Sequence, residues 1–280
     1  MVKIVTDSLS DITSNVAQKL GITVVPLTVL FGHEAYLDRV TITTDEFYRR
    51  LVNGNVWPTT TQPTPKAYAD VYDKLAAETD EILVVTISSK MSGTFQSATG
   101  AKSLATKKAR VEVIDSQTVA MGLGLVVLAA AKKAQAGAKL NELTDFVHHA
   151  LERSHLIIYF DTLKYLAKGG RIGKASGLLG SLLSVKPIAT VKDGEITPIT
   201  RVRSLAAGID HVYHSAAAYS NIEAVAVEHT TNPDEAERMV ETLSPLMPKD
   251  KIIRSTVSPV IGVYAGPGAL AVTVLEGEKK

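Results

Sequence analysis

The chain has 280 residues, of which 45% are hydrophobic and 21% charged, with a formal net charge of +1. This composition is typical of a folded globular protein and argues against a general attraction to nucleic acid or an anionic membrane. The absence of cysteine excludes disulfides, thiolate metal sites and a cysteine nucleophile. We expect a cytoplasmic protein without a secretory signal, in which the longest apolar run, residues 119–131, is a buried helix too short to span a bilayer.

The first half alternates strand and helix patterns. Strands are expected at residues 3–6, 22–31 (one or two strands), 82–87 and 111–114, and helices at 11–20, 44–53, 66–77, 95–108, 117–136 and 140–153. Residues 32–41 are irregular, and residues 57–65 contain three prolines and four threonines, which predicts a loop. Such alternation predicts a mainly parallel sheet covered by helices on both faces.

The second half has a different order of predicted strands and helices. Strands are expected at residues 156–160, 188–191, 195–200, 222–227, 251–254 and 269–275, and helices at 161–167, 176–184, 205–218 and 233–243. Asp193-Gly194 predicts a hairpin between two of these strands. The predicted fold class is therefore two-domain α/β, with an N-terminal mainly parallel α/β/α domain, residues 1–153, and a C-terminal α+β domain, residues 154–280.

Polar residues follow three of the predicted parallel strands, namely Asp7-Ser8, Ser88-Ser89 and Asp115-Ser116. Right-handed crossovers place these strand ends along one edge of the sheet, where open α/β sheets bind ligands. Ser92-Gly93-Thr94 then opens a predicted helix, so Ser92 is well placed to cap it and to leave backbone N–H groups free for an anion. Two interpretations stay open, a site for a small anionic ligand and a serine that only caps its own helix.

Motifs for other chemistry are absent or misplaced. Gly122-Leu123-Gly124 lies inside a predicted helix, and no phosphate-binding Gly-Lys-Ser/Thr loop occurs. His148-His149 point about 100° apart on a helix, and no carboxylate cluster accompanies His211 and His214. No Gly-x-Ser-x-Gly elbow is present. Hydroxyls without an obvious base favour binding over covalent catalysis, and we expect no metal and no cofactor.

A basic cluster surrounds a Gly-Gly turn. It comprises Lys164, Lys168, Arg171 and Lys174, with Arg201 and Arg203 just after the predicted hairpin. The cluster is either a solvated surface or a patch that meets a phosphate or an acidic partner, since arginine offers oxyanions two parallel donors. Further along, Gly266-Pro267-Gly268 follows Tyr264 and predicts a tight turn.

Taken together, these motifs resemble the DegV family, lipid-binding proteins that include the fatty-acid-binding subunits of bacterial fatty acid kinase. The resemblance covers nearly the whole chain. It rests on Val5-Thr6-Asp7-Ser8, Thr60-Thr61-Gln62-Pro63, Ser88-Ser89 with Ser92-Gly93-Thr94, Ile114-Asp115-Ser116, Lys168-Gly169-Gly170-Arg171-Ile172, Lys186-Pro187-Ile188 and Gly266-Pro267-Gly268. Seven motifs in the family's order make it specific.

The resemblance implies a protein that holds one long-chain fatty acid between its domains. It assigns the carboxylate to Thr60 and Ser92, with the Gly93 N–H and a water as further donors. Two positions depart from the family's pattern: Thr61 replaces a serine, and Tyr264 replaces a histidine before the glycine turn. A phenol still donates a hydrogen bond, but unlike a histidine it is not cationic near neutral pH. That change calls into question the carboxylate network and phosphotransfer, though not acyl binding.

The same resemblance associates Arg171 and Arg203 with the kinase subunit or the transferred phosphate. We therefore expect a non-enzymatic lipid-binding subunit that presents a C14–C18 acid such as palmitate to an ATP-dependent fatty acid kinase in phospholipid metabolism. Eight positions are expected to include lining of the tail: Leu27, Leu30, Ile158, Leu163, Leu166, Leu179, Leu182 and Leu183. The alternatives are an enzyme acting on a polar or phosphorylated acid in the same cleft, and a regulatory protein that senses lipid through its basic face.

Overall fold

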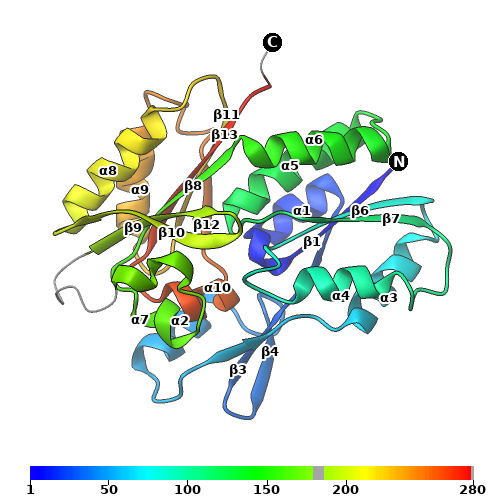
Figure 1. Cartoon of the computed structure of the whole chain (residues 1–280), viewed down its shortest axis with the longest axis horizontal. Helices are drawn as coiled ribbons and strands as arrows, with labels where there is room; N and C mark the ends of the chain where they lie inside the picture. Colours follow the sequence, from blue (N-terminus) through cyan, green and yellow to red (C-terminus); the bar gives the residue numbers. More distant parts are fainter. Residues whose placement is uncertain (179–185, 279–280) are drawn as a thin grey trace.

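The computed structural model describes residues 1–178 and 186–278, whose strands form three sheets (Figure 1). The first sheet is parallel, with the order β2-β1-β6-β7. Its strands are β1 (Lys3–Asp7), β2 (Ile22–Val25), β6 (Glu81–Thr86) and β7 (Arg110–Asp115). The predicted N-terminal parallel sheet is confirmed.

The second sheet has six strands in the order β10-β9-β8-β13-β11-β12, all antiparallel except the β11–β12 pair. They are β8 (Ser154–Tyr159), β9 (Lys186–Lys192), β10 (Glu195–Val202), β11 (Ile222–His229), β12 (Ile253–Thr256) and β13 (Leu270–Glu276). Asp193-Gly194 forms the predicted hairpin between β9 and β10. The α/β fold class is confirmed, whereas the domain boundary between residues 153 and 154 stays a prediction.

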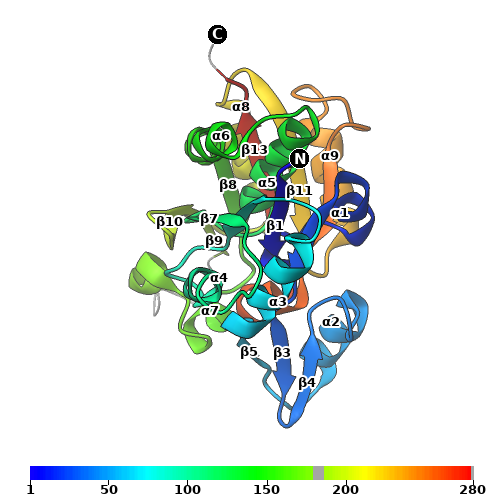
Figure 2. The ribbon, with the colours of Figure 1, turned by 90° about the vertical axis from the view of Figure 1, so that its right-hand side faces the viewer.

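A third, small sheet projects from the body of the molecule (Figure 2). It consists of β3 (Thr28–Phe31), β4 (Glu34–Leu37) and β5 (Thr59–Thr61), with β3 in the centre. The sequence interpretation missed β4, which forms because Gly32 takes a φ of +62° and closes a two-residue turn. It also read residues 57–65 only as a loop. β5 is compatible with the prolines around it because it is a three-residue edge strand.

Helix α5 (Met121–Gln135) lies between the two large sheets. It packs against β1 and β6 on one side and against β8, β11 and β13 on the other. Its residues from Met121 to Ala131 are all buried, as expected for a helix that is apolar on every side. The predicted buried helix is confirmed, although it begins four residues later than expected. α1 (Ser14–Leu20) and α6 (Leu140–Glu152) complete this layer.

Further helices cover the outer faces. α3 (Pro65–Leu75) and α4 (Thr94–Ala101) pack on the parallel sheet through Tyr68, Tyr72 and Ala98, and α8 (Leu205–Ala217) and α9 (Pro233–Leu243) pack on the six-stranded sheet. The remaining helices are α2 (Thr44–Asn53), α7 (Lys164–Lys168), α10 (Pro259–Ala265) and the 3₁₀ turns η1 (Ser8–Ser10) and η2 (Gly173–Leu178).

Two expectations about helices need correction. The sequence interpretation missed α10, because its β-branched residues are more typical of a strand. The helix starts at Pro259 and packs on Phe47 and Tyr48 of α2. The predicted helix at residues 176–184 begins within the 3₁₀ turn η2, and its part from residue 179 onward lies outside the described residues.

Candidate functional site

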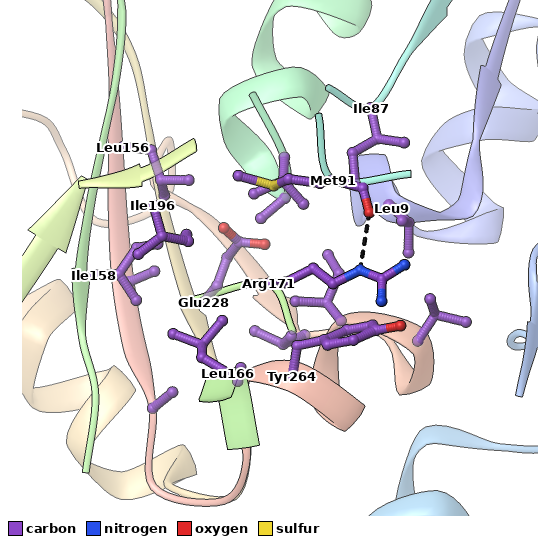
Figure 3. Close-up of a pocket in the computed structure, with 18 of the residues that line it drawn as sticks. Leu9, Ile87, Met91, Leu156, Ile158, Leu166, Arg171, Ile196, Glu228 and Tyr264 are labelled. Carbon is purple, nitrogen blue, oxygen red and sulfur yellow. Dashed lines mark hydrogen bonds between the residues drawn. The ribbon is translucent and has the colours of Figure 1, made fainter. Parts of the chain in front are cut away.

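A pocket of about 900 Å³, counting the solvent at its open end, lies between the six-stranded sheet, the loop after β6, and α10 (Figure 3). Most of its wall is hydrocarbon. Strand β8 contributes Leu156 and Ile158, which lie on the same face of the sheet, and Phe160 follows directly after the strand. Across the pocket lie Leu9 and Ile87 from loops at the end of the parallel sheet. The six-stranded sheet and the segments that follow β1 and β6 therefore both supply the wall.

Five side chains of the lining carry hydrogen-bond donors: Thr60, Gln62, Ser92, Arg171 and Tyr264. The Thr60 Oγ1 and Tyr264 Oη atoms are 2.5 Å apart, and the Arg171 guanidinium lies 5.1 Å from the centre of the Tyr264 ring. Arg171 Nε donates to the Met91 carbonyl at 3.2 Å, which ties the guanidinium to the residue before Ser92. Several donors thus converge on one part of an otherwise apolar pocket.

Ser92 occupies a turn between β6 and α4. The N–H groups of Met91 and Ser92 both donate to the Ser88 carbonyl, which closes the turn. Contrary to our expectation, Ser92 does not cap the helix: Gly93 is the N-cap residue, and Ser92 Oγ lies 2.8 Å from Thr94 Oγ1 instead. The hydroxyl is therefore beside the first turn of α4, whose leading N–H groups have no intrahelical partners.

Gln62 is a pocket residue to which the sequence interpretation gave no role. A Cβ atom on Gly93 would lie 2.8 Å from the Gln62 side-chain nitrogen, so the amide packs directly on that glycine. A side chain at position 93 would therefore have to displace the Gln62 amide. The signal was present in the sequence, because Gln62 belongs to the Thr60-Thr61-Gln62-Pro63 motif.

Strand alternation separates Thr60 from Thr61. Thr60 faces the pocket, whereas Thr61 is exposed and lies outside the pocket lining. Gly93 packs against Gln62, which lines the pocket, but Gly93 is not itself part of the lining. Of the five residues proposed for the carboxylate, the structure thus places Thr60, Ser92 and Tyr264 in the lining.

The two arginines of the predicted partner site lie in different places. Arg171 lines the pocket and donates from Nη1 to the Gly169 carbonyl at 2.9 Å. Gly169 in turn packs on the Tyr264 ring, because a Cβ there would lie 2.3 Å from a ring carbon. Arg203 is exposed, follows β10 and lies outside the lining.

Only some of the residues expected to line the tail lie in the pocket lining. Leu27, Ile158 and Leu166 line the pocket, whereas Leu30 and Leu163 do not. Leu179, Leu182 and Leu183 lie outside the described residues.

The polar residues at the strand ends mostly join loops to each other. The Asp7 carboxylate accepts from the Leu9 and Ile87 N–H groups, and the Asp115 carboxylate accepts from the Ser89 N–H. Ser88 Oγ donates to the Gly194 carbonyl at 2.8 Å and so connects the parallel sheet to the β9–β10 hairpin. The predicted edge therefore exists, but these residues lie outside the pocket lining, which takes Ser92 from the turn that follows.

Beside the pocket lies a cluster of four buried acids, namely Asp7, Asp11, Asp38 and Glu228, together with Arg39. Burial raises the pKa of Asp7 to about 7 and that of Asp38 to about 7. Burial and the neighbouring Asp11 carboxylate raise the pKa of Glu228 well above its usual range. Burial also raises the pKa of Asp11, where Arg39 opposes the effect. Burial thus favours the protonated form of Glu228, which lines the pocket.

The described part of the chain lacks a membrane-spanning helix and a metal-binding cluster. None of its helices is long and apolar enough to cross a membrane. Within the same residues, no group of three or more histidine, aspartate or glutamate side chains is arranged to hold a metal ion.

Comparisons with known proteins show the family of this chain. A family model described as "Uncharacterised protein, DegV family" matches residues 1–277. A DegV domain-containing protein of Caldanaerobacter subterraneus is 37% identical over 275 residues, which cover 97% of each chain.

Among solved structures, a DegV family protein from Thermus thermophilus, described by its fatty acid binding, has a TM-score of 0.90 and 29% identity over 99% of both chains. A stearic acid-binding protein from Eubacterium ventriosum has a TM-score of 0.90 and 27% identity, covering 99% of this chain and 98% of that one. The resemblance drawn from the seven motifs is confirmed. This chain belongs to the DegV family.

Proposed function

We propose that this protein binds one long-chain fatty acid, buries its tail in the pocket and holds its carboxylate near Thr60 and Ser92. The observation that carries the proposal is the chemistry of the pocket, in which hydroxyl, amide and guanidinium donors line the same space as a wall of aliphatic side chains. Fatty acid binding by the related proteins from Thermus thermophilus and Eubacterium ventriosum supports it.

The apolar wall favours a lipid over a polar substrate. Burying a C16 tail at ~0.8 kcal/mol per methylene contributes roughly 10 kcal/mol before ordering costs are subtracted. A small polar acid, the ligand of the alternative enzyme, would gain nothing from Leu156, Ile158 and Phe160. The pocket therefore supports the lipid-binding function better than the enzymatic one.

The carboxylate needs compensation, because an unpaired charge is costly to bury. Ser92, Thr60 and the phenol of Tyr264 are hydroxyl donors, and the Gly93 N–H opens α4. Gln62 adds an amide, and Arg171 adds the positive charge that the tyrosine cannot supply. We assign to Arg171 the role that a histidine at position 264 would have. Thr61, which is exposed, serves at most as a neighbour of this network.

We further propose that a separate ATP-dependent fatty acid kinase receives the presented carboxylate and forms an acyl phosphate for phospholipid metabolism. The sequence has no phosphate-cradling loop of its own. Arg203 is exposed and available to such a partner, whereas Arg171 lies where the carboxylate and the incoming phosphoryl group would meet. Because the reaction requires ATP, we place it in the cytoplasm.

Native mass spectrometry of the purified protein, followed by extraction and identification of the bound compound, tests the proposal. We expect one C14–C18 acid for each chain, with palmitate among the acids taken up by the delipidated protein. A protein that is empty as purified and takes up no added fatty acid would refute the proposal.

A further inference from the structure

An aromatic stack joins the small sheet to helix α7. The indole of Trp57, two residues before β5, lies 4.8 Å from the ring of Tyr165 in α7, and the two ring planes are 24° apart. Lys168, three residues further along the same helix, places its Nζ atom 3.8 Å from the centre of the indole. Contacts of both kinds stabilise a partly exposed indole. Trp57 is therefore attached to α7, although neither Trp57 nor Tyr165 is part of the pocket lining.

Tyr165 is itself held firmly, because α7 and α10 interlock through their tyrosines. A Cβ atom on Gly266, the residue after α10, would lie 2.2 Å from a ring carbon of Tyr165, so the ring packs directly on that glycine. In the reverse direction, the Tyr264 ring of α10 packs on Gly169, the residue after α7. Each helix thus places a tyrosine on the glycine that ends the other. Trp57 therefore stacks on a ring that is fixed relative to Tyr264, one of the donors of the pocket lining.

The segment from Trp57 to Thr60 is short and stiff. The ring of Pro58 fixes its own φ and restricts Trp57 to extended conformations, and Pro58 is buried. Strand β5 (Thr59–Thr61) follows at once, at the edge of the small sheet that projects from the body of the molecule (Figure 2). It pairs with β3 through three residues. Because this pairing is short, the sheet alone holds Thr60 weakly, whereas any movement of Trp57 is transmitted to it.

We propose that Trp57 is a positioning residue, whose stack on Tyr165 holds Thr60 where its hydroxyl donates to the fatty acid carboxylate. This inference rests on the proposed fatty acid function. Thr60 Oγ1 lies 2.5 Å from Tyr264 Oη, so the phenol can donate to the threonine while the threonine donates to the carboxylate. A hydrogen bond weakens steeply when its geometry is disturbed. A small displacement of β5 therefore costs this bond, while the apolar wall on the six-stranded sheet stays in place.

Two ligands with the same tail distinguish this role from general support of the pocket. The affinities of delipidated protein for hexadecanoic acid and for hexadecan-1-ol are measured by displacement of a fluorescent fatty acid. Trp57→Ala should weaken binding of the acid ~10-fold, the fold-change typical of one lost hydrogen bond to a charged group. It should weaken binding of the alcohol much less, because a neutral head group gains less from the same donor. Equal losses for the two ligands, or no loss for the acid, would overturn the inference.

Further variants assign the effect to the stack and to Thr60. Trp57→Phe keeps a ring that can stack on Tyr165 and should bind the acid as the unmodified protein does. Trp57→Leu keeps an apolar side chain without a ring and should behave like Trp57→Ala. In a Thr60→Val background, Trp57→Ala should cause no further loss of acid affinity, because the hydroxyl through which Trp57 acts is already gone. Additive losses in this double-mutant cycle would refute the role of Thr60.

The matched control is Tyr219→Ala. It removes another partly exposed aromatic side chain, which stacks on His155 with ring centroids 4.0 Å apart and lies outside the pocket lining. It should leave the ratio of acid to alcohol affinity unchanged.

The outcomes separate this inference from the proposed function. If the unmodified protein binds the acid and Trp57→Ala binds it equally well, the inference fails alone. If the unmodified protein binds neither ligand, the proposed function fails and takes the inference with it. Thermal unfolding shows whether each variant is folded. Should Trp57→Ala not fold, the comparison of Trp57→Phe with Trp57→Leu decides the matter, since both keep an apolar side chain and equal acid affinities would refute the need for a stack.

Discussion

The replacement Asp38→Asn should change how the stability of this protein depends on pH. Asp38 is 2% exposed, and its Oδ2 atom accepts from Ser8 Oγ at 2.8 Å. Its other oxygen, Oδ1, lies 3.9 Å from Arg39 Nε, and the Val260 N–H is a further donor beside the carboxyl. An asparagine can accept from Ser8 in the same way, so the substitution removes the titration with little change in packing.

The magnitude follows from the two protonation equilibria. Burial raises the pKa of Asp38 from 3.8 to about 7 in the folded protein, where the carboxyl therefore binds its proton more tightly than in the unfolded chain. Its contribution to stability is complete below pH 3.8 and is lost as the pH rises through the folded-state value. With 1.36 kcal/mol for each pKa unit, the loss is roughly 4 kcal/mol between pH 3.5 and pH 8. The asparagine variant does not suffer it.

Urea unfolding at closely spaced pH values measures this effect. The free energy of unfolding of the unmodified protein, minus that of Asp38→Asn, should fall by about 4 kcal/mol between pH 3.5 and pH 8. Asp250→Asn, which changes an exposed aspartate in the same way, is the control for the chemical replacement itself. Parallel curves for the unmodified protein and Asp38→Asn would show that Asp38 is ionised in the folded state throughout, and would refute the reasoning.

The remaining predictions concern the pocket and the proposed kinase partner. Ser92→Ala should weaken acyl binding by ~1–3 kcal/mol in a competition assay, because a charge-assisted donor is lost. Ser103→Ala, in the turn after the C-terminal end of α4, should not weaken it, and equal affinities for the Ser92→Ala and unmodified proteins would move the anchor elsewhere. Tyr264→Phe removes the hydroxyl bonded to Thr60 and should weaken binding by ~1 kcal/mol in that assay. Arg203→Ala should spare acyl binding and slow acyl phosphate formation with the kinase; a loss of both would contradict a purely external role.

The parallel sheet and its helices could be predicted because their residues follow the expected periods closely. Residues 82–87 and residues 119–131 are so apolar that each segment must be buried. Their lengths then distinguish a strand from a helix. The hairpin at Asp193-Gly194 was predictable from turn chemistry alone. By contrast, α10 was missed because its valines and isoleucine favour a strand locally, and only packing against α2 decides for a helix.

Residues of the candidate site were predictable only where they belong to a recognisable sequence motif. Ser92 and Thr60 belong to short hydroxyl-rich stretches, and the structure brings both to the pocket. Nothing local distinguishes Thr60 from Thr61, since strand alternation decides which faces inward. Glu228 was missed for a related reason: a single acid in a strand pattern is usually solvated, and only the position of α5 shows that this one is buried.

The pocket also explains why binding and folding should be coupled in this protein. Its donors Thr60 and Ser92 come from the small sheet and the loop after the parallel sheet, whereas most of its apolar wall belongs to the six-stranded sheet and α10. A fatty acid that bridges these parts binds the folded state and not the unfolded chain. At a free ligand concentration 100 times the Kd, such a ligand adds about 2.7 kcal/mol to the free energy of unfolding. Delipidated protein should therefore unfold at a lower temperature than the loaded form, and equal melting temperatures would place the ligand outside this pocket.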